Sequence, residues 1–147
     1  MKSYGNMKIL FVAGFGPVVN HFDETRKLYR NVFGIPFKEY ENGYMFTEEG
    51  VLEGVKHFAL WPLAHAAQNC FGEDTWPTDL PVPQAWIEFD VENVYEAANE
   101  LKSQGYRLLF EPREEPWGQT VTRFLDPEGI LVGITQTPWL RHNDERT

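Results

Sequence analysis

Two stretches of the chain repeat the same order of apolar and polar segments. The first opens with the apolar run KILFVAGFGPVV (8–19), which is typical of a buried strand. A segment with apolar residues at helical spacing follows at 23–34, where an aspartate can cap the start and a glycine the end. Three strand-like segments complete this stretch, at 36–40, 43–48 and 55–61, and an Asn-Gly pair predicts a hairpin between the first two.

The second stretch follows the same order. An alternating strand (85–91) precedes a helical segment (95–105), and three strand-like segments follow at 106–111, 119–125 and 129–136. The last two segments are joined by DPEG, which is a typical turn sequence. The sequence therefore predicts an α+β fold in which two βαβββ modules form one concave mixed sheet.

The boundaries of the modules follow from this pattern. We expect a first module at 8–63, a connecting loop at 64–83 and a second module at 84–137, which together form one domain. The connection contains a glycine and several prolines (Gly72, Pro77, Pro81 and Pro83). Connections of this length are often functional, and Trp76 within it is expected either to cover a cleft or, as the simpler alternative, to pack within the loop.

Side chains alternate between the two faces of a strand, so each predicted strand divides into two sets. In AWIEFDV (85–91), Ile87 and Phe89 form the face that suits contact with a helix, and Trp86 and Glu88 form the other. The corresponding face of the other strands carries mostly tryptophans, small residues and a few polar groups. Its further members are His57, Ala59, Trp61, Leu131, Gly133, Thr135, Val12, Gly14 and Gly16. We expect this face to contact a ligand.

Composition narrows the classes of function. The 147 residues include 22 acids and 13 bases, which give a net charge of −9. A nucleic-acid partner is not expected, because phosphate binding requires a basic surface. The acidity suits a neutral or cationic small molecule, although solubility alone also explains it. The longest apolar run is too short to cross a membrane. A single cysteine, Cys70, and the lack of a signal-like start predict a cytoplasmic location.

Two segments connect the chain with a known family. The terminal FLDPEGILVGITQ (124–136) and the helical RKLYRNVFGIPF (26–37) resemble the vicinal oxygen chelate superfamily. This superfamily includes glyoxalase I, extradiol dioxygenases, fosfomycin-modifying enzymes and bleomycin resistance proteins. The resemblance covers residues 8–137 and implies the fold of that superfamily. It also implies a homodimer, because modules of this size commonly pair.

The resemblance further implies where a metal ion would be held. In the enzymes of the superfamily, His, Gln or Glu ligands come from the first and last strands of each module. Carried over to this sequence, the four positions fall at Gly14, Ala59, Trp86 and Gly133, none of which can bind a metal. We therefore expect no metal and no cofactor. The small residues predict an empty hollow walled by Trp61 and Trp86, as in the metal-free bleomycin resistance branch.

Three tryptophans are candidate ligand-binding residues. Trp61 and Trp86 are expected either to stack on a planar ligand or to be buried where the modules or subunits meet. Trp117, which precedes a glycine, is expected to form the rim of the cleft or to anchor a turn.

Three polar residues complete the set of candidates. Glu88 is expected to pair with a cationic ligand or to be solvated. His57 is expected to be a hydrogen-bond partner, a general base or a surface group. Arg123 is expected to bind a ligand carboxylate or to form an ion pair with Glu88 across the sheet.

These residues predict a small-molecule-binding protein that holds a planar or cationic compound without catalysis, including sequestration of a drug. The alternative is a lyase, isomerase or dioxygenase of the same superfamily. Such an enzyme would use a displaced metal site or acid–base chemistry at His57 and Glu88. A third class is an interaction module in which the cleft is closed.

Overall fold

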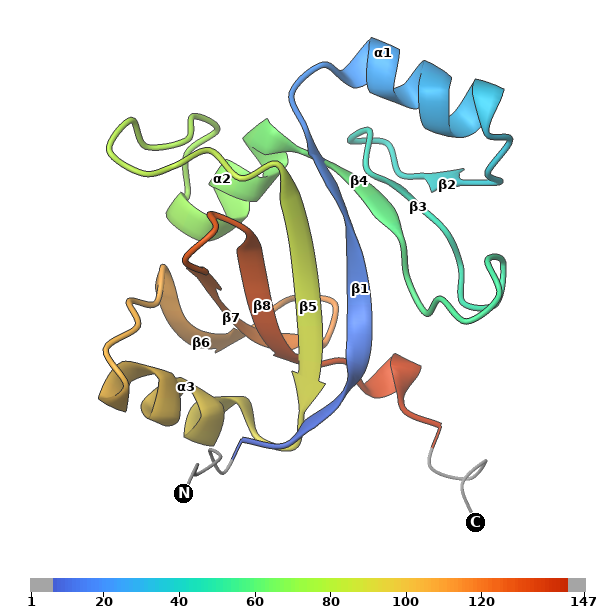
Figure 1. The fold of residues 1–147 in the computed structure, drawn as a ribbon. Coiled ribbons are helices and arrows are strands. Elements are labelled where there is room, and N and C mark those ends of the chain that lie inside the picture. Colours follow the sequence, from blue (N-terminus) through green and yellow to red (C-terminus); the bar gives the residue numbers. More distant parts are fainter. Residues whose placement is uncertain (1–6, 143–147) are drawn as a thin grey trace.

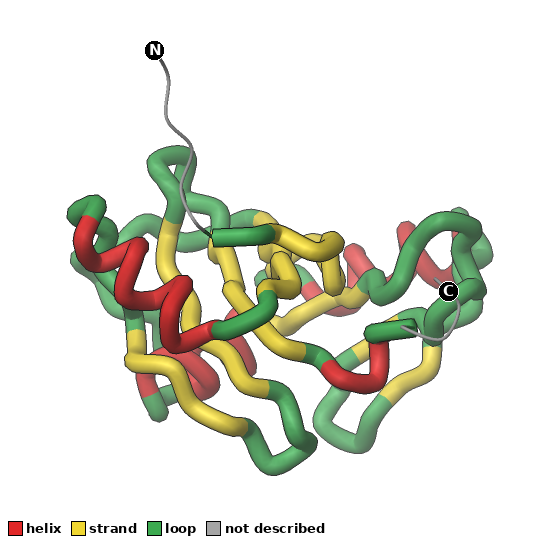
Figure 2. Tube along the Cα trace, turned by 90° about the horizontal axis from the view of Figure 1, so that it is seen from below, coloured by secondary structure: helices red, strands yellow, loops and turns green. Residues whose placement is uncertain are grey.

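A computed structural model describes residues 7–142 of the chain. These residues form one eight-stranded sheet in the order β2-β3-β4-β1-β5-β8-β7-β6, with helices against both faces (Figures 1 and 2). The strands are β1 (Ile9–Val19), β2 (Lys38–Glu39), β3 (Met45–Phe46), β4 (Ala59–Pro62), β5 (Ala85–Val91), β6 (Phe110–Glu114), β7 (Thr120–Leu125) and β8 (Leu131–Gln136). The helical elements are α1 (Phe22–Arg26), the π-helical η1 (Lys27–Val32), α2 (Leu63–Phe71), α3 (Val94–Ser103) and the 3-10 turn η2 (Pro138–Leu140).

The sheet repeats one arrangement twice. In each module the first strand pairs in parallel with the last, β1 with β4 and β5 with β8. The two modules join where β1 and β5 pair antiparallel at the centre of the sheet. This mixed sheet, with a helix after the first strand of each module, confirms the α+β fold of two βαβββ modules expected from the sequence.

The outer face of the second module is covered by α3. Asn93 caps this helix, because its side-chain oxygen accepts a 3.1 Å hydrogen bond from the backbone N–H of Glu96. Val94 and Ala97 of the helix are buried against the strand residues Val91 and Ile134. The first module has a weaker equivalent, because no residue of α1 or η1 is fully buried. Tyr29 of η1 contacts the sheet through its ring, whose centroid lies 5.8 Å from the ring centroid of Phe58.

The connection between the modules differs from the sequence-based expectation, because it starts as a helix. Helix α2 follows β4 directly and ends at Gly72, whose φ of +77° favours glycine. The alanine-rich sequence favours a helix, but Pro62 at the N-cap makes no side-chain capping bond and so gave no start signal. The small residues of the helix, Ala66, Ala67 and Cys70, pack on the inner face of the sheet against Trp61 and Trp86.

Trp76 lies in the same connection and packs within it. Its ring is buried against Phe71, with centroids 5.0 Å apart, and its indole N–H donates a 2.9 Å hydrogen bond to the carbonyl of Pro81. This is the loop-packing alternative considered for Trp76. Within residues 7–142 no helix combines the length and apolarity needed to cross a bilayer.

The chain after β8 packs against β5 and contacts both modules. Asp90 of β5 is fully buried and accepts hydrogen bonds from the N–H and hydroxyl of Thr137, at 2.8 and 2.6 Å. Arg141 adds a 2.7 Å bond from Nε to the same carboxylate. Lys56 of the first module donates a 3.1 Å bond to the carbonyl of Leu140. The C-terminal segment 137–141 therefore ties the second module to the first.

Candidate functional site

A row of five residues crosses the middle of the inner face. The sheet register pairs Gly14 with Glu88, Glu88 with Gly133, and Gly133 with Arg123. On the other side of Gly14 lies His57, because the neighbouring residue Phe15 bridges in parallel to Phe58 and donates its N–H to the carbonyl of His57. We call His57, Gly14, Glu88, Gly133 and Arg123 the central row. Three polar side chains alternate in it with two glycines.

Two of the positions taken from the family resemblance lie outside the central row. Ala59 and Trp86 do not lie in line with Gly14 and Gly133, because Glu88 is the β5 residue between the two glycines. Ala59 and Trp86 lie two residues further along the chain than His57 and Glu88, and a shift of two residues keeps the same face, so the alternation does not reveal it. The row therefore contains one histidine and one carboxylate that the resemblance had placed outside it.

An ion pair fills the space beside Gly133. Arg123 Nη1 lies 2.8 Å from Glu88 Oε2, and the two side chains come from strands on either side of β8. A Cβ added to Gly133 would lie 2.8 Å from both Arg123 Nη1 and Glu88 Cγ. The hollow that was expected to be empty is thus occupied, and the glycine is needed because the pair meets directly above it. Pairing with Glu88 was the structural alternative for Arg123, and the structure confirms it.

Arg123 is held on several sides. Only 3% of its side chain is exposed. Its Nε donates a 3.1 Å hydrogen bond to the Asn69 side chain on α2, and its guanidinium lies 4.7 Å from the ring centroid of Trp61. Glu88 is 13% exposed and also accepts a 3.1 Å bond from Gln119 Nε2. Arg123 is therefore a fixed internal cation, while Glu88 keeps some access to the inner face.

The other glycine of the row makes room for two rings. A Cβ on Gly14 would lie 3.0 Å from Trp86 Cη2 and 3.1 Å from His57 Cδ2. The ring centroids of His57 and Trp86 are 6.1 Å apart at an angle of 62°. The edges of both rings therefore meet over Gly14, as the side chains of the ion pair meet over Gly133.

His57 is held as a neutral imidazole. Tyr44 Oη lies 2.7 Å from His57 Nε2. Burial lowers the pKa of His57, and the negative charge of Glu88 offsets part of this effect. Burial, followed by the charge of Glu88, raises the pKa of Tyr44, so its hydroxyl keeps its proton. The tautomer of the imidazole decides whether this hydroxyl donates to Nε2 or accepts from it. In the tautomer whose Nε2–H donates to Tyr44, Nδ1 keeps its lone pair and can accept a hydrogen bond or act as a base.

The lowered pKa of His57 has a measurable effect on stability. The unfolded chain binds a proton at His57 below pH about 6.5, whereas the folded chain resists that proton. Between these two pKa values the unfolded state binds more protons, so His57 makes stability decrease as the pH falls. We expect urea unfolding of His57→Gln to show less loss between about pH 7 and pH 5 than the parent protein. The exposed His21→Gln is the control, and an equal loss in both variants would refute the assignment.

Of the three candidate tryptophans, two are buried and one is exposed. Trp61 and Trp86 are buried beneath α2 with ring centroids 5.8 Å apart at 79°, and the Trp86 indole N–H donates a 3.2 Å bond to the carbonyl of Ala59. Both rings are therefore covered and do not offer an open surface on which a ligand could stack. Trp117 is 57% exposed, and its indole N–H bonds to Gln119, which also bonds to Glu88. Trp117 is thus exposed and connects to the central row through one glutamine.

Three aromatic residues next to the row were not identified from the sequence. The rings of Tyr40, Tyr44, Phe46 and His57 lie within 15–33° of parallel, with centroid distances of 4.9–6.1 Å. Tyr40 is exposed, and Tyr44 and Phe46 are half-buried. The alternation in GYMFTE places Tyr44 and Phe46 on one face. Pairing of that strand with β4, which His57 precedes by two residues, would have revealed the cluster.

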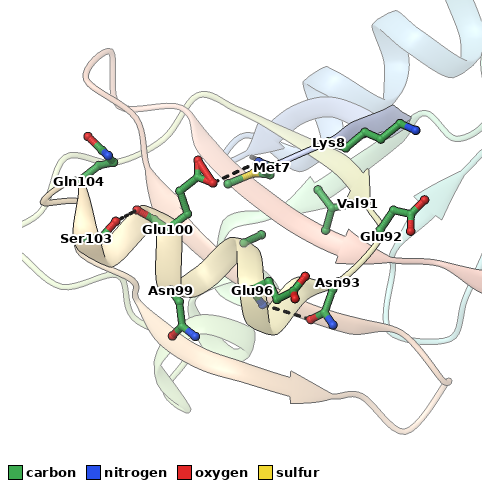
Figure 3. Close-up of a pocket in the computed structure, with 11 residues that line it drawn as sticks. Met7, Lys8, Val91, Glu92, Asn93, Glu96, Asn99, Glu100, Ser103 and Gln104 are labelled. Carbon is green, nitrogen blue, oxygen red and sulfur yellow. Dashed lines mark hydrogen bonds between the residues drawn. The ribbon is translucent and has the colours of Figure 1, made fainter. Parts of the chain in front are cut away.

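A surface groove occurs on the outer face, away from the central row. It is lined by Met7 and Lys8, which precede β1, by the end of β5 with the two residues after it, and by helix α3 (Figure 3). Hydrogen bonds within the groove already join Met7 to Glu100 and Asn93 to Glu96. None of the candidate residues from the sequence lines this groove, so it is separate from the candidate site.

The central row does not fit a divalent metal ion. It offers one imidazole and one carboxylate, and the carboxylate is already bound by Arg123 and Gln119. The guanidinium places a fixed positive charge beside that carboxylate, which would repel a metal cation. Within residues 7–142 no three His, Cys, Asp or Glu side chains come together as metal ligands do.

Comparison with known proteins identifies the family. The model of the Glyoxalase/Bleomycin resistance protein/Dioxygenase superfamily matches residues 14–134. The chain belongs to this superfamily, as its sequence resemblance indicated. A related protein is the Bleomycin resistance protein of Klebsiella pneumoniae, which is 28% identical over 126 residues, or 81% of this chain and 86% of the relative.

Solved structures share the fold at low sequence identity. A variant of Streptomyces coelicolor methylmalonyl-CoA epimerase in complex with 2-nitronate-propionyl-CoA is 18% identical, with a TM-score of 0.55 over 92% of this chain and 99% of that chain. A superfamily member from Vibrio splendidus 12B01 is 17% identical, with a TM-score of 0.53 over 90% of this chain and 100% of that chain. These likenesses support the fold described above.

Proposed function

We propose that this protein binds a small planar or cationic organic molecule at the central row, without a metal ion and without changing it chemically. Sequestration of a drug of the bleomycin type is the role that the relative from Klebsiella pneumoniae suggests. The observation that carries the proposal is the central row itself, in which Arg123 fixes Glu88 while Glu88 and His57 remain partly accessible.

The chemistry of the site suits such a ligand. The near-parallel rings beside His57 offer apolar surface to a planar group, and the neutral imidazole and Glu88 supply hydrogen-bonding atoms. The net charge of −9 attracts a cation from solution. Because Glu88 is already paired with Arg123, it orients a ligand through hydrogen bonds more than it neutralises a charge.

Two further properties belong to the same proposal. The protein forms a homodimer, which its superfamily resemblance favours. It resides in the cytoplasm, where its buried, unpaired Cys70 remains reduced, since burial raises the pKa of that thiol to about 11.

Calorimetric titration with metal-free bleomycin tests the proposal. We expect one binding event per chain in the presence of a chelator. His57→Ala and Trp117→Ala should each weaken it roughly 2- to 13-fold, since an aromatic contact contributes about 0.5–1.5 kcal/mol beyond burial. Trp139→Ala is the matched control, because Trp139 is similarly exposed but lies in the C-terminal segment. A lack of heat on titration, or equal weakening in the control, would refute this function.

A proton-transfer enzyme is the second candidate, and the neutral His57 beside Glu88 favours it. In such an enzyme His57 would accept a proton from an acidic carbon, with Tyr44 bonded to its ring. Incorporation of solvent deuterium into a carbon acid such as methylmalonyl-CoA, abolished in His57→Ala, would favour this candidate over simple binding.

A further inference from the structure

His57 lies outside the regular part of the sheet. Strand β4 begins at Ala59, and residues 47–58 between β3 and β4 form a long loop, which we call the His57 loop. Glu88, in contrast, lies in the middle of β5, where pairing with the strands on both sides fixes its position. The position of His57 relative to Glu88 therefore depends on the contacts that hold this loop.

On its C-terminal side, His57 is held by the backbone. The N–H of Phe58 donates a 3.2 Å hydrogen bond to the hydroxyl of Thr47, and the carbonyl of Phe58 accepts a 2.8 Å bond from the Thr47 N–H. The carbonyl of His57 itself accepts a 3.2 Å bond from the N–H of Phe15. On the N-terminal side the neighbouring residue is Lys56, and there it is the side chain that makes the anchoring contacts.

The Lys56 side chain is anchored by three separate parts of the chain. Its ammonium donates a 3.1 Å hydrogen bond to the carbonyl of Leu140 in the C-terminal segment, and it lies 3.3 Å from the Glu49 carboxylate in its own loop. It also lies 4.7 Å from the ring centroid of Phe11 on β1. Glu49 in turn lies 2.7 Å from Nε2 of His142, which directly follows the C-terminal segment. Because only 23% of the Lys56 side chain is exposed, these contacts give it one defined position.

The C-terminal segment reaches both sides of the ligand site. Besides Lys56 it binds the carboxylate of Asp90, which lies two residues after Glu88 on the same face of β5. The turn η2 within the segment lies at the end of the sheet where β5 finishes (Figure 1). The segment therefore contacts the neighbour of His57 and a near neighbour of Glu88, and it spans the distance between them.

We propose that Lys56 is a positioning residue of the ligand site, which fixes His57 relative to Glu88 by anchoring the His57 loop on the C-terminal segment. The effect of Lys56 on a ligand rests on the proposed function, whereas its effect on His57 needs no ligand. The Lys56 ammonium acts through His57 and not by contact, because it is already bonded to the Leu140 carbonyl and paired with a carboxylate. Release of this anchor loosens the loop and lets water reach the imidazole.

Titration of the histidine rings by proton NMR tests the proposal without any ligand. In Lys56→Met the pKa of His57 should rise toward its ordinary value by about half a pH unit or more, because water reaches an imidazole that burial now keeps neutral. Lys56→Arg keeps the charge and the donors, so it should retain the parent pKa. His57→Gln assigns the resonance. The titratable groups that face His57, Tyr44 and Glu88, are unchanged in the two Lys56 variants.

Asp90→Ala separates loosening of the loop from loss of charge. Removal of the Lys56 cation would itself raise the pKa of His57, but removal of the Asp90 carboxylate would lower it. A rise in Asp90→Ala therefore reports release of the C-terminal segment. Trp139→Ala trims an exposed side chain of the same segment and should leave the pKa of His57 unchanged. If Asp90→Ala does not fold, Thr137→Val removes one bond to the carboxylate without a change of charge and should give a smaller rise.

Bleomycin titration extends the test to the ligand. Loss of a positive charge from the protein should tighten the binding of a cationic ligand, whereas loss of a positioned His57 should weaken binding roughly 2- to 10-fold, the value of one hydrogen bond. Lys56→Met is expected to weaken it and Lys56→Arg to restore it. Lys102→Met is the control for charge, because it removes an equal charge from a surface ion pair with Glu111.

The outcomes separate this proposal from the proposed function. An unchanged His57 pKa in Lys56→Met, a rise that persists in Lys56→Arg, no rise when the C-terminal segment is released, or equal weakening of bleomycin binding by Lys102→Met would overturn the positioning role. A parent protein that binds no bleomycin removes the proposed function, and the pKa of His57 in the variants still decides the role of Lys56.

Discussion

Replacement of Arg123 by methionine is expected to lower the free energy of unfolding by about 3–5 kcal/mol, because it leaves the largely buried Glu88 carboxylate without its counter-charge. Arg123 Nη1 lies 2.8 Å from Glu88 Oε2, and only 3% and 13% of the two side chains are exposed. Methionine preserves most of the volume next to Trp61, so loss of packing contributes little. Urea unfolding at neutral pH, monitored by tryptophan fluorescence, measures the effect.

An exposed arginine supplies the control for this prediction. Arg107→Met removes the same charge from the protein surface, where substitutions usually change stability by less than about 0.5 kcal/mol. If Arg123→Met costs no more than Arg107→Met, the ion pair over Gly133 does not stabilise the fold. The account of the central row would then be wrong.

Replacement of Asp90 by alanine is expected to cost about 3–4 kcal/mol, since it removes the acceptor for three hydrogen bonds. The Asp90 carboxylate is fully buried, and the N–H and hydroxyl of Thr137 and the Arg141 guanidinium all donate to it. In the variant these donors lose their partner, and the C-terminal segment 137–141 should detach from the sheet. Urea unfolding measures the loss, and faster cleavage of this segment by a protease reports the detachment.

The neighbouring surface acid separates this effect from a change in net charge. Glu92→Ala alters the charge of the chain equally, but Glu92 is exposed after the end of β5. Its effect on stability and on proteolysis should be small. An Asp90→Ala variant that unfolds with the parent's free energy would show that the carboxylate does not hold the C-terminal segment.

The alternation of side chains along the strands correctly predicted many of the residues that lie on the inner face. It placed Trp86 and Glu88 on the face opposite Ile87 and Phe89. In the structure Ile87 and Phe89 are partly buried against the cluster that includes α3, and Trp86 and Glu88 face inward. The prediction succeeded because strand geometry repeats every two residues and the apolar pattern marks the covered face. The same rule failed for Val12, because the pairing irregularities in β1 break the period of two.

The contacts between strands could not be predicted in the same way. The glycine at 133 was correctly expected to create space, but the sequence did not show that Arg123 and Glu88 would meet there, since this depends on the register of three strands. Register also decided that Glu88, not Trp86, lies between the glycines. Helix α2 was missed because a short alanine-rich segment without a capping residue carries few local signals.

The most direct test of the central row is a double-mutant cycle between Arg123 and Glu88, measured by urea unfolding in the presence of a metal chelator. The parent protein, Arg123→Met, Glu88→Gln and the double variant should give a coupling energy of about 1.5–3 kcal/mol. The parent's stability should be the same with and without the chelator. A coupling energy near zero, or a parent protein that loses stability when divalent ions are removed, would contradict the claim that an internal ion pair occupies the space over Gly133.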